Sequence, residues 1–284
     1  MIPQSRAARA VAGLLAAGAG TALCAGVAIG THGTEPLETR SASTPIAGAE
    51  SKSVRARCRR GSKAVSGGFQ TNANASLRPI FAYGSRPGGP RGWTASGFDF
   101  GPDDGFVRSF AYCRPERFQT RSASVEVSGV TGSVVARCPR GSRAISGGFD
   151  DPDFDGSTGR PVIAYQSRRA GKRRWRVVGQ RVSPEIGELS AHVRCARAKA
   201  PKVARAQATL DPMASGATRI VARCKRGRRA ISGGFESDAP PLPGKGSVVL
   251  IRALRKLGQR RWMVSVAATG IETTVTAYAY CERA

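Results

Sequence analysis

One stretch of sequence occurs three times and constrains the fold more than any other feature. The copies read CRRGSKAVSGGF from Cys58 to Phe69, CPRGSRAISGGF from Cys138 to Phe149, and CKRGRRAISGGF from Cys224 to Phe235. A Trp and then a second Cys follow each copy at nearly constant distance: Trp93 and Cys113, Trp175 and Cys195, Trp262 and Cys281. A recurrent motif with a fixed period indicates structural repeats, so we expect three related units.

The repeats have the pattern of short β-strands. In the first unit Val54, Ala56 and Cys58 alternate with arginines, which is the period of a half-buried strand. Four further strands are predicted at residues 64–69, 79–86, 93–98 and 106–113, separated by Gly/Pro-rich turns, and the other units repeat this order. The predicted fold class is all-β, with three tandem antiparallel sandwich or barrel units that each contain one internal disulfide.

The unit boundaries follow from the repeats. We predict a signal peptide at 1–30, a flexible linker at 31–51, unit 1 at 52–115, unit 2 at 116–199 and unit 3 at 200–284. The joining segments Ser122–Val127 and Arg205–Leu210 also alternate like strands and would give units 2 and 3 a sixth strand. The sequence leaves open whether the units are independent or share one pseudo-threefold body.

The cysteines predict disulfides. Six of the seven fall as one pair per unit, and no CxxC or Cys/His spacing suits zinc. We therefore pair Cys58 with Cys113, Cys138 with Cys195, and Cys224 with Cys281. Units of this size have marginal cores, and closing a loop of about 55 residues stabilises a fold by roughly 4 kcal/mol in the chain-entropy model.

The N-terminal segment predicts export. Arg6 and Arg9 precede an uncharged Ala/Gly/Leu run from Ala10 to Gly30, as in a secretory signal. An uncleaved membrane anchor is the alternative, because the run is about long enough to span a bilayer. The expected localisation is secreted or cell-surface, and any membrane contact would be made through this segment.

The charge balance indicates polyanionic partners. Lys and Arg number 45 and Asp and Glu 19, which gives a formal net charge of +26. Such a surface attracts anionic envelope polymers or other extracellular polyanions, and nucleic acid without sequence specificity. Basic side chains recur after each first Cys and, in units 2 and 3, in the hairpin before the Trp; if the two regions lie at the same end, they form a cationic rim. The candidate polyanion-binding residues are Arg60, Lys63, Arg140, Arg143, Arg168, Arg173, Arg226, Arg229, Arg255 and Arg260.

Other recurrent residues favour structural roles. The Gly-Gly pairs at 67–68, 147–148 and 233–234 suit close approach of another backbone or of the Trp ring, with an anion-binding nest as the alternative. The tryptophans are expected to cover each core, with a sugar-stacking platform as the alternative. His192 falls at an aromatic position of its unit, matching Phe110 and Tyr278, so a His-based catalytic site cannot recur in every unit.

One acidic loop partly matches a calcium site. Asp151 to Gly156 reads DPDFDG, with carboxylates at alternate positions, but Val162 stands where a bidentate Glu is required. Whether Asp151–Asp155 binds calcium stays open, and we predict no catalytic residue, metal or cofactor.

The pattern Cys-x-x-Gly, Gly-Gly, Trp and Cys resembles a short module of secreted and surface proteins of actinobacteria. It covers Cys58–Cys113, Cys138–Cys195 and Cys224–Cys281. The resemblance implies an exported, disulfide-linked β module and carries no assigned activity.

These observations favour a non-enzymatic envelope protein that contacts anionic polymers through Arg-rich loops. The alternative is a surface lectin that uses Trp93, Trp175 and Trp262. A hydrolase lacks support, because neither His nor paired carboxylates recur in the repeats.

Overall fold

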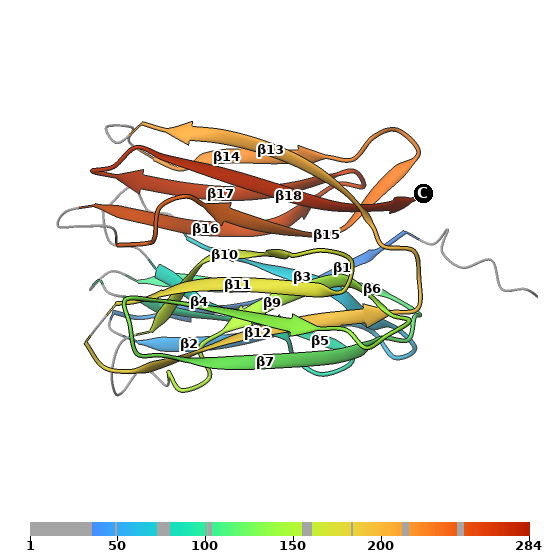
Figure 1. Ribbon diagram of the computed structural model, residues 1–284, viewed down its shortest axis with the longest axis horizontal. Coiled ribbons are helices and arrows are strands. Elements are labelled where there is room, and N and C mark those ends of the chain that lie inside the picture. The colour runs from blue at the N-terminus through green and yellow to red at the C-terminus, as the bar shows by residue number, and fades with distance from the viewer. Residues whose placement is uncertain are drawn as a thin grey trace, which may run out of the picture. The chain divides into compact units, whose positions relative to one another are not determined.

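The part of the chain that the structure describes folds into eighteen β-strands, six from each sequence repeat. Figure 1 shows how these strands are arranged. The computed structural model describes residues 36–48, 50–72, 80–99, 101, 104–154, 161–182, 184–211, 216–242 and 247–284. Within this part of the chain there is no helix, and hence none that could cross a membrane. The predicted signal peptide lies outside the described residues.

Each repeat contributes the same strand series. Repeat 1 contains β1 (Glu38–Ile46), β2 (Ser51–Arg57), β3 (Lys63–Thr71), β4 (Ile80–Pro87), β5 (Gly92–Asp99) and β6 (Gly105–Arg114). Repeat 2 contains β7 (Gln119–Val127), β8 (Thr131–Arg137), β9 (Arg143–Asp150), β10 (Val162–Arg169), β11 (Arg174–Arg181) and β12 (Gly187–Ala196). Repeat 3 contains β13 (Lys202–Leu210), β14 (Thr218–Arg223), β15 (Arg228–Ser237), β16 (Val248–Leu257), β17 (Arg261–Thr269) and β18 (Thr273–Arg283).

The all-β prediction and the sixth strands of repeats 2 and 3 are confirmed, but the linker prediction for 31–51 is wrong for residues 38–46. Glu38–Ile46 forms β1, which pairs with β6 from Glu38↔Cys113 to Ile46↔Gly105. The strand alternates half-buried and exposed residues, so it is an edge strand with little apolar content. Because its residues are mostly Ser, Thr and Pro, its composition does not differ from that of a linker.

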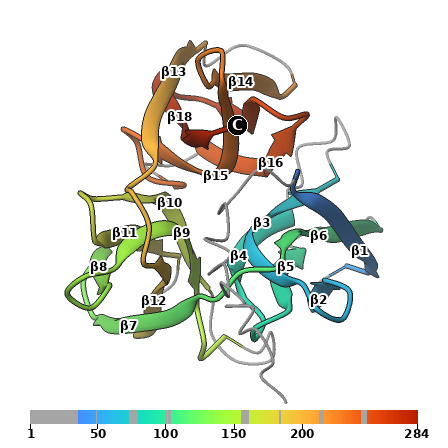
Figure 2. The ribbon, with the colours of Figure 1, turned by 90° about the vertical axis from the view of Figure 1, so that its right-hand side faces the viewer.

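The repeats are joined through shared sheets. The sheet orders are β1-β6-β3-β16-β17-β14, β13-β18-β15-β10-β11-β8 and β2-β5-β4-β9-β12-β7, so every sheet takes three strands from each of two repeats. We call the contacts between neighbouring repeats junctions 1/2, 2/3 and 3/1. In a view along the strands, the three repeats surround a common centre (Figure 2). Residues 34–284 form one compact unit, so the repeats share one body.

Two layers of side chains mark the common centre. Ser66 Oγ donates a hydrogen bond to the Ile231 carbonyl. Ser232 Oγ donates to Ile145 O at 2.5 Å, and Ser146 Oγ donates to Val65 O at 2.5 Å, which closes a ring through all three repeats. Further along the same strands, Phe149 makes edge-to-face contacts with Phe69 and Phe235 at centroid distances of 6.0 and 5.8 Å. The repeats therefore surround a pseudo-threefold axis.

The Gly-Gly pairs allow two close contacts, as the structural interpretation predicted. A Cβ on Gly147 would lie 2.3 Å from Trp175 Cδ2, within the same repeat. A Cβ on Gly148 would lie 1.9 Å from Ser85 O, across junction 1/2. The other two pairs have equivalent neighbours, so the first glycine admits the Trp ring and the second admits the neighbouring repeat.

The three predicted disulfides are confirmed, with one in each repeat. Each joins the residue after β2, β8 or β14 to the end of β6, β12 or β18, and so crosses from one sheet to another. The tryptophans lie beside them and are at most 1% exposed. The Gly of each Cys-x-x-Gly motif, such as Gly61 at φ 83°, is in the left-handed region, which favours glycine at this turn.

Candidate functional site

The loop after each first Cys lies against the tip of the following hairpin. The Cys58, Cys138 and Cys224 amides donate to the Arg91, Arg173 and Arg260 carbonyls at 2.7, 2.8 and 2.8 Å. We call residues 58–62, 138–142 and 224–227 the Cys loops, and residues 88–91, 170–173 and 258–260 the hairpin tips. The two regions on which the predicted cationic rim depends therefore meet in every repeat.

An arginine clamp ties each tip to its Cys loop. Arg173 Nε and Nη2 donate to Cys138 O at 3.1 and 2.9 Å, and Arg260 binds Cys224 O at the same distances. Arg91, which the motif comparison missed, binds Cys58 O in the same way at 3.3 and 2.9 Å. These guanidinium groups are held in place, and their remaining N–H groups can meet a ligand without a large loss of side-chain entropy.

All three rims lie at one end of the body. Strands β3, β9 and β15 each carry, near their start, one of the serines (Ser66, Ser146 and Ser232) whose hydrogen bonds form the ring at the common centre. Near their end they carry one of the phenylalanines (Phe69, Phe149 and Phe235) that contact one another there. They therefore run in the same direction along the axis, and the Cys loops that precede them lie at the same end. We call this the basic end.

Acidic residues gather toward the opposite end. The strand directions place there Glu50, Asp99, Asp104, Glu126, Asp150, Asp151, Asp153, Glu185, Glu188, Asp211, Glu236, Asp238 and Glu272. At the basic end the described acidic residues are Glu38, Glu116 and Glu282, and each is ion-paired with an arginine. The net positive charge is thus concentrated at the basic end. We call the opposite end the acidic end.

The predicted polyanion-binding residues differ in their exposure. Arg60, Arg140 and Arg226 are exposed on the Cys loops, while Lys63 and Arg143 are half-buried. Arg229 is buried, and its Nε lies 2.6 Å from Glu282 Oε1. The matched positions of the motif therefore supply three exposed cations, one in each repeat.

Two predicted residues lie in the junctions instead of on the rim. Arg168 pairs with Glu236 at 2.9 Å and lies over the Tyr278 ring at junction 2/3. Arg255 lies over the Phe110 ring at junction 3/1. Both are half-buried, so their charges face neighbouring repeats.

Further exposed cations were missed by the motif comparison. Arg57, Arg137 and Arg223 each occupy the last position of a strand, directly before the first Cys, and all three are exposed. The recurrent Ala-Arg-Cys tripeptide was the available signal. Arg174 and Arg261, at the starts of β11 and β17, are also exposed beside their hairpin tips.

His192 lies in junction 1/2. Burial, reinforced by the Arg86 guanidinium, lowers the pKa of His192 to about 4. Burial raises the pKa of Asp150 to about 6, although Arg86 Nε lies only 2.5 Å from its carboxylate and acts in the opposite direction. The imidazole is therefore neutral at pH 7, at a position where the other repeats place Phe110 and Tyr278.

One carboxylate of the acidic loop of repeat 2 makes a hydrogen bond within the protein. Asp151 Oδ2 accepts a hydrogen bond from the Val162 amide at 2.7 Å. Asp155 lies outside the described residues, and the part of the chain that the structure describes contains no group of three or more metal-ligating side chains. The calcium question therefore remains a matter of prediction.

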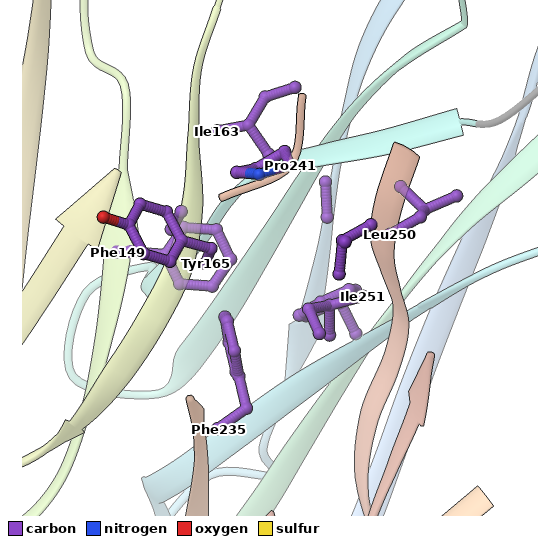
Figure 3. Close-up of a pocket in the computed structure, with 11 residues that line it drawn as sticks. Phe149, Ile163, Tyr165, Phe235, Pro241, Leu250 and Ile251 are labelled. Carbon is purple, nitrogen blue, oxygen red and sulfur yellow. The ribbon is translucent and has the colours of Figure 1, made fainter. Parts of the chain in front are cut away.

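Among the described residues, the cavity at the pseudo-threefold axis is too small for a ligand. Aromatic and aliphatic side chains, among them Phe149, Phe235 and Leu250, face a small cavity there (Figure 3). Its volume is about 10 Å³, close to the minimum for one water molecule. The burial of the tryptophans likewise leaves no ring face against which a sugar could stack.

Comparison with known proteins returns no matching family model and no matching curated protein.

Proposed function

We propose that this protein is an exported, non-enzymatic binding protein of the cell envelope whose basic end contacts anionic polymers. The observation that carries the proposal is the gathering of exposed cations from all three repeats at that end. Acidic side chains at the opposite end would orient the molecule, so that approach to a negative surface is favoured from one direction.

The three disulfides are consistent with an extracellular location, because such bonds persist in oxidising compartments. Contacts of Lys and Arg with polymer phosphates release counterions, so binding would be salt-sensitive and would not depend on sequence or monomer order. Teichoic-type polymers, acidic polysaccharides and nucleic acid all present this chemistry.

The test measures the affinity of the mature protein for wall teichoic acid, heparin and duplex DNA over a range of salt concentrations. We expect log K to fall linearly with log salt concentration. Replacing Arg60, Arg140 and Arg226 with Gln removes one exposed charge from each Cys loop. This variant is expected to bind about tenfold more weakly and with a shallower salt slope.

The matched control is Lys52→Gln, Arg181→Gln and Arg219→Gln. It removes the same charge from strand ends at the acidic end and is expected to keep nearly the full affinity. Salt-insensitive retention, no retention of the wild type, or equal losses in both variants would contradict the proposal.

A further inference from the structure

The hairpin tips of repeats 2 and 3 are hollowed at equivalent places. In repeat 2 a depression of about 370 Å³ is lined by Arg137, Cys138, Gly171, Lys172, Arg173 and Arg174. In repeat 3 a depression of about 220 Å³ is lined by Arg223, Leu257, Gly258, Gln259, Arg260 and Arg261. We call these the repeat 2 cup and the repeat 3 cup. They recur around the pseudo-threefold axis with most of their lining residues matched.

Each cup contains three arginines at matched positions: Arg137, Arg173 and Arg174 in repeat 2, and Arg223, Arg260 and Arg261 in repeat 3. The clamp arginines Arg173 and Arg260 use Nε and Nη2 on a Cys carbonyl, and their other N–H groups have no hydrogen-bond partner among the described residues. Arg174 Nε donates to Ala170 O at 2.9 Å, and Arg261 Nε makes the same contact with Leu257 O at 3.4 Å. Both guanidinium groups are thereby held against the hairpin, with their terminal nitrogens available.

None of the ion pairs among the described residues involves these cup arginines. Several guanidinium groups around one concavity, without a carboxylate to neutralise them, suit a dense oxyanion such as a phosphate or sulfate group. Because the adjoining Cys138 and Cys224 are disulfide-bonded, the cup floor is fixed to the body.

Repeat 1 differs at the same positions. Pro90 and Gly92 occupy the positions of Lys172 and Arg174, so these two positions carry no charge in repeat 1. The Arg55 guanidinium instead lies along the tip, with its Nη2 2.8 Å from where a Cβ on Gly89 would be. In repeats 2 and 3 the matching residues are Val135 and Val221.

We propose that the repeat 2 and repeat 3 cups are a pair of quasi-equivalent binding sites for phosphate or sulfate groups of an anionic polymer, and that repeat 1 has no such site. This inference rests on the proposed function and assigns it to particular residues. The Cys-loop arginines contribute through long-range attraction, while the cup arginines hold the oxyanion directly.

The test compares two variants that lose the same charge at the same end. The cup variant carries Arg137→Gln, Arg174→Gln, Arg223→Gln and Arg261→Gln. The loop variant carries Arg60→Gln, Arg140→Gln, Lys225→Gln and Arg226→Gln. All eight side chains are exposed, and thermal unfolding of both variants checks that the fold is retained.

Binding is measured with long-chain polyphosphate and with heparin, which separate phosphate from sulfate as the source of the oxyanion. The cup variant is expected to lose about 100-fold in affinity, roughly tenfold for each cup, and the loop variant only about tenfold. Equal losses in the two folded variants would overturn the cup assignment while leaving the proposed function intact. Absence of salt-dependent binding by the wild type would instead overturn the proposed function.

Discussion

At the scale of single residues, three copies of one motif act as an internal comparison. Tyr112 and Tyr280 each cover a Trp of the neighbouring repeat and accept a hydrogen bond from the Lys256 or Arg169 amide at 2.7 Å. At junction 1/2 the matching donor position is Pro87, which has no amide hydrogen. Arg194 replaces the Tyr there and donates to Gly89 O at 2.7 Å, so the two substitutions compensate each other.

The Gly-Gly pair supports a direct prediction at this scale. Gly147→Ala would place a Cβ 2.3 Å from Trp175 Cδ2 and 2.4 Å from His192 O. Because neither the buried ring nor the strand backbone can move away freely, we expect the free energy of unfolding to fall by about 3 kcal/mol. Chemical denaturation of the disulfide-intact protein measures this.

The matched control is Gly129→Ala, at an exposed turn where the nearest atom to an added Cβ is 3.9 Å away. If Gly147→Ala were no less stable than this control, the assigned role of the first glycine would be wrong.

Some site residues could be predicted from the sequence and others could not. The cysteine pairing and the structural role of the glycines follow from the repeat alone. By contrast, Arg168 and Arg229 carry the same sequence signal as exposed arginines, yet they pair with Glu236 and Glu282. Those acidic partners lie far along the chain, so only the folded structure brings them to the arginines.

At the scale of the strand, the interior strands were predictable and one edge strand was missed. β1 and β7 share the segment Thr-Arg-Ser-Ala-Ser, at 39–43 and 120–124, and both pair with the last strand of their repeat in the same register. That identity was the available signal. Alternation in β1 involves Ser, Thr and Ala, so apolar content did not separate it from a linker.

Junction 1/2 differs from the other two junctions in its titratable groups, and this predicts a pH dependence. His192 has a pKa of about 4 in the folded protein, below the ordinary value of 6.5. Its stabilising contribution is therefore present above pH 6.5 and is lost as the pH falls toward 4. Asp150 acts in the opposite direction, because its raised pKa of about 6 favours the folded state at low pH.

The variant His192→Phe isolates the histidine, because it installs the residue that repeat 1 has at this position. Between pH 7 and pH 4.5 we expect the free energy of unfolding of the wild type to fall by about 2 kcal/mol more than that of the variant. Thermal or urea unfolding at the two pH values measures the difference. Parallel losses in both proteins would rule out His192 as the cause.

At the scale of the whole molecule, the separation of basic and acidic side chains along the pseudo-threefold axis could not be predicted from the sequence. Basic and acidic residues are interspersed in the chain, and strand direction decides the end at which each one lies. The sharing of sheets between repeats could not be predicted either, because the strand pattern of one repeat does not specify which strands of a neighbouring repeat complete its sheets. The Ser and Phe of the central strands, Ser146 and Phe149 among them, mark the shared centre only once the strands are assembled.

The most direct test of the central claim, that the basic end is the binding face, is to map bound polyphosphate by backbone amide NMR shifts. We predict that the shifts will be concentrated in the Cys loops and hairpin tips, largest at 170–174 and 258–261, and will weaken as salt is added. Shifts centred on the acidic end, for example around Glu126 and Glu188, or spread evenly over all three sheets, would contradict the account.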